Sequence, residues 1–367
     1  MKQHDNKSAQ STPVLPCLSP SGHYGEIHGV TPPMLKRLYG ADGANFPTGI
    51  GITCGIVVPF GSPSLAEDLA VFSRTFSLPD ADLIIRGGEN ASKTAMHGEW
   101  VLESSLDIQW LHAWAPDSRL IAYFAESDSF EAVFDALQSA ERECDIVSLS
   151  LGKEEFEGET AYEAFFAQSR ALFTGAAGDN QTARYPSCSA HVLCVGGTRA
   201  FTDSAGDLIG EETVWNGTGS GISRYIDSPA YQRIFGTIYA DSNGKRAIPD
   251  LAFFASGENG AALYHSTEVL GNSGWTDAVG TSIGAPCIAG LCACTAEKNR
   301  TVLRDKNAFF YRLAGQSAYT DPHRAFRDIV RGESGGYFAS EGYDFCSGLG
   351  TPRADRWVKP TAAASRA

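Results

Sequence analysis

The chain has 367 residues, of which 43% are hydrophobic and 20% charged, and its formal net charge is −14 at pH 7. This length can bury one large core, and the acidic balance argues against nucleic acid and anionic membranes as partners. No apolar run is long enough to span a bilayer, and the N-terminus lacks the apolar core of a signal peptide, so we expect a cytoplasmic rather than a secreted protein.

The nine cysteines are an odd number, so they cannot all pair within one chain. Several lie in apolar segments, which is typical of small buried hydrophobic residues in a reduced protein. Cys292 and Cys294 have motif-like spacing, but neither a second cysteine pair nor a histidine cluster lies near them. We therefore do not expect a metal at that pair.

The order of predicted elements indicates the fold class. Residues 1–29 are rich in Ser, Pro, Gln and Asn and are expected to form a flexible tail or wrapping arm, and a short helix is predicted to begin at Thr31. Short apolar strands then alternate with segments of helical periodicity. The predicted strands are 50–58, 83–85, 120–124, 145–151, 172–177 and 191–196, and the predicted helices are 64–76, 100–114, 130–142 and 162–168. This alternation predicts a single α/β domain over residues 30–360, with a parallel sheet covered by helices on both faces.

Two carboxylates, Glu103 and Asp107, lie four residues apart in one predicted helix. The spacing places both on one helix face, and Trp110 and Trp114 continue roughly the same stripe. Carboxylates this close to each other and to aromatic rings are expected to share a proton and to have at least one raised pKa. Such a group can take a proton from a serine hydroxyl at mildly acidic pH. A solvated helix face is the simpler explanation of the spacing alone, and Glu99 and Glu103 are spaced in the same way.

Ser282 precedes an apolar helix of small residues that has Pro286 in its first turn. A serine at this position lies at the positive end of the helix dipole, which also helps to stabilise an oxyanion. Gly280 permits a close approach of the backbone. These features favour a nucleophile, although an N-cap serine accounts for them equally well.

Residues 280–284 also fit the G-x-S-x-G elbow of α/β-hydrolases. That fold requires an acid and then a histidine after the serine. Here the downstream histidine is His323, with Asp305 or Asp321 before it. The spacing is short and the serine comes late in the chain, so we disfavour this fold.

Asp179 follows the predicted strand 172–177 and precedes a loop that contains proline. An acid at the carboxyl end of a strand is well placed for chemistry, and a protonated carboxyl can donate a hydrogen bond to a tetrahedral oxyanion. From the local sequence alone, an ordinary turn aspartate is the more economical interpretation.

Together these segments resemble one family, the sedolisins, which are serine-carboxyl peptidases of subtilisin-like fold. The segments that carry the resemblance are 103–110, 175–179, 186–198 and 280–286, with further likeness at 212–216, 223–224 and 248–252. The resemblance covers roughly residues 30–355. It implies a subtilisin-like catalytic domain over residues 30–360 with a calcium loop at 328–344.

The resemblance also implies a role for each candidate residue. Ser282 would be the nucleophile and Glu103 the general base. Asp107 would orient Glu103 and share its proton, and Asp179 would stabilise the oxyanion. Glu99 competes for the role of base, but the run from Glu103 matches the family better.

A calcium site is expected in the glycine-rich loop near the C-terminus. Asp328 and Asp344, together with carbonyl groups of the turn, supply the hard oxygen ligands that Ca²⁺ prefers. A glycine-rich surface turn is the alternative. The resemblance implies one structural ion, held by the two carboxylates and by the backbone carbonyls of Ile329, Ser340 and Gly342.

The chain departs from the family at several positions. Only about 29 residues precede the expected catalytic domain, where sedolisins usually carry a long prodomain. Either the protein is a prodomain-less form or a prodomain has been removed, and we favour the first. Val58 or Pro59 and Leu151 stand where many members have glutamate and tryptophan. Ile283 and Gly284 replace the usual alanine and serine.

The sequence thus predicts a monomeric peptidase that acts on peptide or protein substrates through an acyl-enzyme at Ser282, best at acidic pH. One alternative is a dedicated acyl transferase or processing enzyme of a biosynthetic pathway on the same scaffold. A non-catalytic binding protein on a peptidase scaffold is a third hypothesis.

Overall fold

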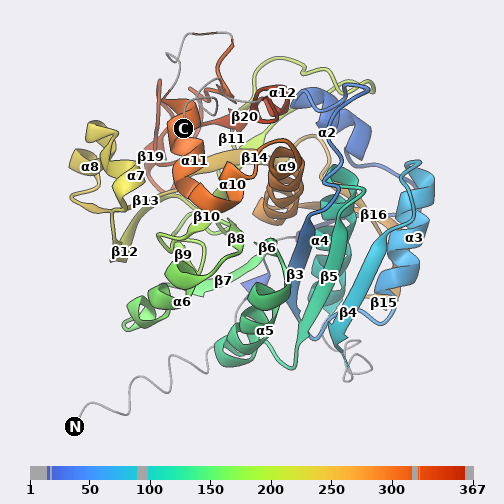
Figure 1. The fold of residues 1–367 in the computed structure, drawn as a ribbon. Helices are drawn as coiled ribbons and strands as arrows, with labels where there is room; N and C mark the ends of the chain where they lie inside the picture. Colours follow the sequence, from blue (N-terminus) through green and yellow to red (C-terminus); the bar gives the residue numbers. More distant parts are fainter. Residues whose placement is uncertain (1–14, 17–18, 89–97, 316–320, 322, 360–367) are drawn as a thin grey trace.

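The computed structural model describes residues 15–16, 19–88, 98–315, 321 and 323–359. Its main sheet has eight strands in the order β11-β10-β8-β6-β3-β5-β4, with β14 paired to β10. Figure 1 shows β4, β5 and β3 side by side, with α3 (Leu65–Thr75) at the β4 edge. Every pair in this sheet is parallel except β10–β11. The strands are β3 (Thr53–Pro59), β4 (Asp82–Gly87), β5 (Arg119–Ala125), β6 (Ile146–Leu149), β8 (Leu172–Ala176), β10 (Val192–Arg199), β11 (Thr213–Val214) and β14 (Leu251–Ser256).

Helices cover both faces of the sheet, as the sequence predicted. A Cβ added at Gly55 of β3 would lie 2.7 Å from the Sγ of Cys144, the residue that caps α5 (Phe130–Glu143), so this face of β3 packs on α5. Successive strand residues point to opposite faces. The neighbouring residues of β3 therefore face the other layer, where α4 (Gly98–Trp114) and α9 (Gly284–Lys298) pack on each other and on the sheet.

Helix α4 is buried on all sides over nearly its whole length. Such a helix belongs in the interior, and its polar side chains there need partners. The Gln109 amide donates to the Tyr264 carbonyl (2.7 Å) and accepts from the Tyr264 N–H (3.0 Å). Tyr264 belongs to β15 (Ala261–Val269), which pairs with β16 (Asn272–Val279). Helix α4 is therefore held between α9 and a second, antiparallel sheet.

Helix α9 approaches α4 closely because its residues are small and apolar. A Cβ at Gly290 would lie 2.5 Å from Trp114 Cβ and 3.1 Å from the Leu111 carbonyl oxygen. Neither α9 nor any other helix in the described parts of the chain combines the length and apolar character needed to cross a bilayer.

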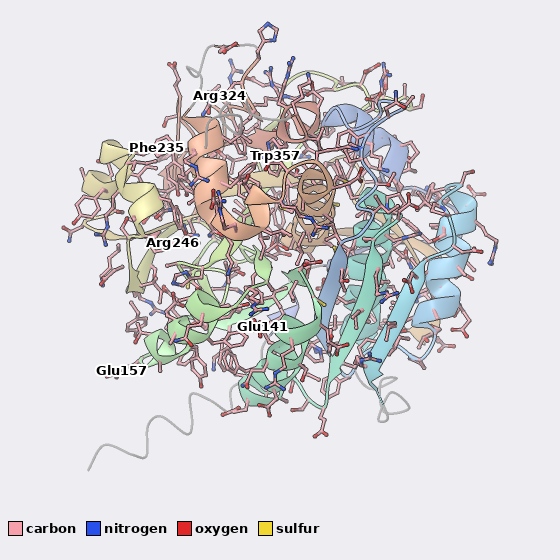
Figure 2. The ribbon with its side chains drawn as sticks, in the orientation of Figure 1. Glu141, Glu157, Phe235, Arg246, Arg324 and Trp357 are labelled. Atoms are coloured by element: carbon pink, nitrogen blue, oxygen red, sulfur yellow. The ribbon has the colours of Figure 1, made fainter. Side chains whose placement is uncertain are left out.

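The C-terminal half adds shorter elements that the sequence did not assign. A buried ion pair links two of them, one that holds Arg246, labelled in Figure 2, and one that holds Tyr311. Arg246 Nη2 lies 2.6 Å from Asp250 Oδ2, and the Tyr311 hydroxyl donates to Asp250 Oδ1 (2.7 Å). The other helical elements of the described residues are α2 (Pro32–Leu38), η2 (Glu159–Tyr162), α6 (Glu163–Gln168), α7 (Ala230–Arg233), α8 (Gly236–Asp241), η3 (Thr281–Ile283), α10 (Thr301–Asp305), α11 (Asn307–Ala314) and α12 (Ala354–Trp357). Further short strands are β9 (Arg184–Tyr185), β12 (Gly221–Asp227), β13 (Lys245–Ile248), β17 (Phe326–Arg327), β18 (Glu333–Ser334), β19 (Tyr337–Phe338) and β20 (Thr351–Pro352).

Two segments differ from the sequence predictions. The predicted strand 145–151 is interrupted at Ser150: β6 pairs with the main sheet, whereas β7 (Leu151–Glu154) pairs antiparallel with β9. Within the expected tail, β1 (Leu15–Pro16) and β2 (Ser19–Tyr24) pair with β7 and β16. β1 and β2 are the outer strands of their sheets. Their outer edges offer N–H and C=O groups that can bind another strand. The first fourteen residues of the expected tail lie outside the described residues.

The contact between α4 and α9 leads to a stability prediction. Gly290→Ala places a methyl group against Trp114 and Leu111, and such overpacking costs about 1–3 kcal/mol of unfolding free energy. Gly236→Ala is the matched control, because a Cβ there has no heavy atom within 4 Å. Urea unfolding at one fixed pH measures both variants. Equal midpoints for Gly290→Ala and the control would contradict this view of the helix contact.

Candidate active site

Ser282 lies in the short helical turn η3 between β16 and α9. The turn begins at Gly280, whose φ of 141° is rare for residues that carry a Cβ. A Cβ at Gly284 would lie 2.8 Å from Val195 Cγ1 of β10, so the start of α9 packs tightly against the main sheet. Ser282 is therefore fully buried at the positive end of a fifteen-residue helix.

The Ser282 hydroxyl donates to a carboxylate of α4. The distance from Ser282 Oγ to Glu103 Oε2 is 3.1 Å, and Glu103 is only 1% exposed. Glu99 lies one turn earlier on α4 and is exposed. The structure thus brings Glu103, and not the competing Glu99, to the serine.

Asp107 lies one further turn along α4 and is fully buried. Burial raises the pKa of this carboxyl well above its usual range, and a hydrogen bond from Ser150 opposes the shift only in part. In the described parts of the chain, Asp107 Oδ2 has no hydrogen-bond partner. Burial therefore favours the protonated form of the Asp107 carboxyl.

Ser150 is a site residue that the sequence analysis missed. Its hydroxyl donates to Asp107 Oδ1 at 2.6 Å, and its carbonyl oxygen lies 3.5 Å from Ser282 Oγ. Ser150 occupies the gap between β6 and β7, so it touches both the carboxyl group on α4 and the serine. The available signal was a hydroxyl residue within an otherwise apolar strand pattern.

Asp179 follows β8 and is hydrogen-bonded to Thr281, the residue before Ser282. Its Oδ1 accepts from the Thr281 N–H (2.9 Å) and from the Thr281 hydroxyl (2.8 Å). Burial raises the pKa of Asp179 to about 7, against the lowering effect of these two bonds. Both bonds use Oδ1, which leaves Oδ2 to carry the proton.

A second buried acidic cluster, also missed from the sequence, consists of Glu155, Glu159 and Cys188. One ligand atom from each lies within 4.8 Å of the others. Glu155 accepts from the Ser223 hydroxyl and the Arg224 N–H, and Glu159 accepts from the Phe156 N–H. Burial, reinforced by the neighbouring carboxylate, raises the pKa of Glu159 to about 8. Because internal donors already bind these oxygens, the cluster suits a retained proton better than a metal.

A polar cavity of about 370 Å³ opens beside β7 and the loop after Asp179. Its walls carry charges of both signs. They include Glu154, Glu155, Gln181, Ser220, Arg224 and Tyr337. The cavity is large enough for a long polar side chain.

The expected calcium loop brings its two aspartates into one turn structure. Asp328 Oδ2 accepts from the Gly342 N–H (2.9 Å), and Asp344 Oδ2 accepts from the Ser340 N–H (3.1 Å). Asp328 Oδ1 is buried and lacks a hydrogen-bond partner among the described residues. Burial raises the pKa of both carboxyls. The orphaned buried oxygen of Asp328 fits a cation ligand, whereas both carboxylate oxygens of Asp344 already accept internal hydrogen bonds.

Comparison with known proteins identifies the family to which the chain belongs. The sequence profile of the subtilase family matches residues 84–313. The chain belongs to the subtilase family. Within it the chain carries a sedolisin-type catalytic domain, since three sedolisin-like relatives match most of its length. The expected family and fold are thereby confirmed.

The relatives share moderate identity with the chain. Sedolisin of Pseudomonas sp. (strain 101) is 26% identical over 374 aligned residues, covering 89% of this chain and 60% of the relative. Kumamolisin of Bacillus sp. (strain MN-32) is 30% identical over 289 residues (68% and 49%), and tripeptidyl-peptidase 1 of Dictyostelium discoideum 29% over 343 residues (81% and 52%). The chain thus spans about half to three-fifths of the length of these relatives.

A solved structure supports the fold independently. Pseudomonas sedolisin, in complex with two molecules of pseudo-iodotyrostatin, superposes with a TM-score of 0.76 at 24% identity, covering 91% of this chain and 98% of that one. This likeness shows a common fold for the sedolisin-type domain.

Proposed function

We propose that the chain is a serine-carboxyl peptidase in which Ser282 attacks the peptide carbonyl. The observation that carries this proposal is the 3.1 Å bond from Ser282 Oγ to a buried glutamate, with a protonatable aspartate tied to the preceding residue. In the described site the partner of the serine hydroxyl is a carboxylate rather than an imidazole. Membership of the sedolisin family supports the same reaction class.

The first step assigns a separate role to each side chain. As Ser282 Oγ forms a bond to the carbonyl carbon, its proton passes to Glu103. The negative charge on the carbonyl oxygen is stabilised by the protonated Asp179 carboxyl and by the start of α9. Asp107, whose pKa is raised by burial and which is oriented by Ser150, lies one turn from Glu103 and shares its proton.

The second step releases the products. Glu103 returns the proton to the departing amine nitrogen as the peptide C–N bond breaks, which leaves an acyl group on Ser282. Water then attacks this ester, again with Glu103 as base, and the peptide leaves as a carboxylic acid. The substrate is a peptide or protein, and the cavity beside β7 is the place for one of its polar side chains.

We further propose that the 328–344 loop binds one calcium ion. The carboxylates of Asp328 and Asp344 and the backbone carbonyls of Ile329, Ser340 and Gly342 would hold it. The buried, unpaired Oδ1 of Asp328 supports this assignment. When bound, the ion would supply only structural stabilisation, because a cation offsets the cost of burying the two carboxylates.

The assignment of the base can be tested with a matched pair of variants on α4. Glu103→Gln removes the group that accepts the serine proton, so kcat for a peptide substrate is expected to fall by on the order of 10²–10⁴. Glu99→Gln changes an exposed carboxylate one turn away and is expected to leave kcat unchanged. Peptide-library cleavage followed by mass spectrometry, with Ser282→Ala as the blank, gives the rates. Normal turnover by Glu103→Gln would refute the proposed base.

The protonation of Asp179 predicts the alkaline limb of the pH profile. Its carboxyl donates only while protonated, so kcat is expected to fall as the pH rises through about 7. Asp179→Asn keeps a donor that does not titrate, and its alkaline limb is expected to flatten. Asp179→Ala removes the donor and is expected to lose roughly 10²–10³ in kcat at every pH. An unchanged limb in Asp179→Asn would assign it to another group.

The calcium site can be tested without any activity measurement. Removing Ca²⁺ with EGTA, from a start at about 100 times its Kd, is expected to lower the unfolding free energy by roughly 3 kcal/mol. Asp328→Asn is expected to abolish this difference, whereas Asp80→Asn, at an exposed position, is expected to preserve it. Thermal unfolding with and without EGTA supplies the comparison. An EGTA effect that survives in Asp328→Asn would disprove the assigned ligands.

A further inference from the structure

The side chain of Arg184 fills a narrow slot beside the nucleophile. A Cβ added at Gly178 would lie 2.7 Å from Arg184 Cδ, and one added at Gly152 would lie 3.2 Å from Arg184 Cβ. Carbon atoms pack at about 3.5–4.0 Å, so the arginine occupies the space that a side chain at Gly178 would need. Arg184 belongs to β9, which pairs with β7. The slot is thus bounded by β7 on one side and by the loop after β8 on the other.

Both walls of this slot are tied to Ser282. Gly152 lies two residues after Ser150, whose carbonyl oxygen is 3.5 Å from Ser282 Oγ. The Gly178 N–H donates to the Thr281 hydroxyl (3.0 Å), and Thr281 directly precedes the serine. In the proposed reaction Ser282 Oγ bonds to the substrate carbonyl carbon, and the Cα that carries the substrate side chain is one bond, about 1.5 Å, farther. That side chain therefore has the slot within its reach.

Arg184 brings a buried positive charge to this slot. The residue is only 8% exposed, its Nε donates to Asn180 Oδ1 (3.0 Å), and its Nη1 is buried without a hydrogen-bond partner among the described residues. Glu154 lies opposite Arg184 in the β7–β9 pair, but it is exposed, where solvent and salt screen its charge. Burying a charge is costly unless an opposite charge lies close to it. The unpaired donor therefore fits an anionic group.

Asp179 does not supply that anion at the pH at which the enzyme is expected to act. Burial raises the pKa of its carboxyl to about 7, and the nearby charge of Arg184 opposes this shift only in part. Below that pH Asp179 is mostly neutral, and its Oδ1 already accepts two hydrogen bonds from Thr281. A carboxylate side chain of a substrate, whose pKa is ordinarily about 4, stays charged in the same range.

We propose that Arg184 is a specificity-determining residue, which directs the peptidase to substrates with a carboxylate side chain on the residue whose carbonyl Ser282 attacks. The inference rests on the proposed peptidase function and specifies its substrate class. The guanidinium offers charge-assisted hydrogen bonds to glutamate or aspartate, which a neutral amide of the same shape cannot match. A bulky apolar side chain is disfavoured, because it would meet a charge and the stem that already fills the slot.

The test compares two peptides that differ only at this residue, one with glutamate and one with its neutral isostere glutamine. We expect kcat/KM of the wild type at pH 6 to be about 10–100-fold higher for the glutamate peptide, because a hydrogen bond to a charged group is typically worth this much. Lowering the pH through about 4.3 is expected to abolish the difference, since the glutamate side chain becomes protonated. Chromatography with mass spectrometry of the products gives the rates and identifies the cut bond.

Two substitutions at Arg184 separate its charge from its packing. Arg184→Met keeps an unbranched side chain in the slot but removes the charge, so kcat/KM is expected to fall for the glutamate peptide far more than for the glutamine peptide. Arg184→Lys keeps the charge without the planar fork and is expected to retain only part of the preference. Arg119→Met, the control, removes an exposed positive charge at the start of β5 and is expected to leave the preference unchanged. Thermal unfolding at pH 6 checks that each variant is folded.

Each contrary result has a distinct meaning. A wild type that cuts both peptides equally at pH 6 would overturn the inference and leave the proposed function standing. An equal fall for both peptides in Arg184→Met would assign the arginine to the geometry of the Asp179 loop instead. If Arg184→Met does not fold, Arg184→Lys serves in its place, and an undiminished preference there would overturn the inference. A folded wild type that cuts neither these peptides nor a peptide library would overturn both.

Discussion

The close packing of α4 on α9 is the constraint on which the site depends. Glu103 and Ser282 come from segments far apart in the sequence, and they meet because Gly290 lets the two helices approach at Trp114. The same contact removes Glu103 and Asp107 from water. Burying two carboxylates is costly unless they are hydrogen-bonded or protonated. The interface therefore positions the acids and also sets their protonation.

In this interior, protonation of the Asp107 and Asp179 carboxyls takes the place of pairing with basic side chains. Asp107 and Asp179 both have raised pKa values because burial disfavours their charged forms, and among the described residues no basic side chain is hydrogen-bonded to either. Ser150 and Thr281 supply hydroxyl hydrogen bonds that orient the two carboxyls. A histidine base would be charged at the acidic pH at which these groups hold their protons, whereas a glutamate can still act there. The residue types of the site are thus matched to one another.

The sequence predicted the parts of the molecule that leave a periodic pattern. The alternation of strands and helices gave the parallel sheet with two helix layers, and the four-residue spacing of Glu103 and Asp107 put both on one buried helix. Ser150 was missed because its role arises where β6 ends and β7 turns to another partner, a change of pairing that periodicity does not record. The short elements of the C-terminal half were likewise beyond local patterns, since long-range contacts such as the Arg246–Asp250 pair stabilise them.

The backbone around Ser282 also bears on recognition. The strands that flank the serine are paired on both sides, β7 with β1 and β9, and β16 with β15 and β2. Such backbone pairing does not depend on the side chains of the paired segment. Selectivity must then come from side-chain contacts, and β7 contributes Glu154 to the polar cavity next to its paired edge. Gln181, two residues after Asp179, lines the same cavity. The segments around Ser282 therefore also form a wall of this cavity, so a change in that wall is coupled to the geometry of Ser150 and Asp179.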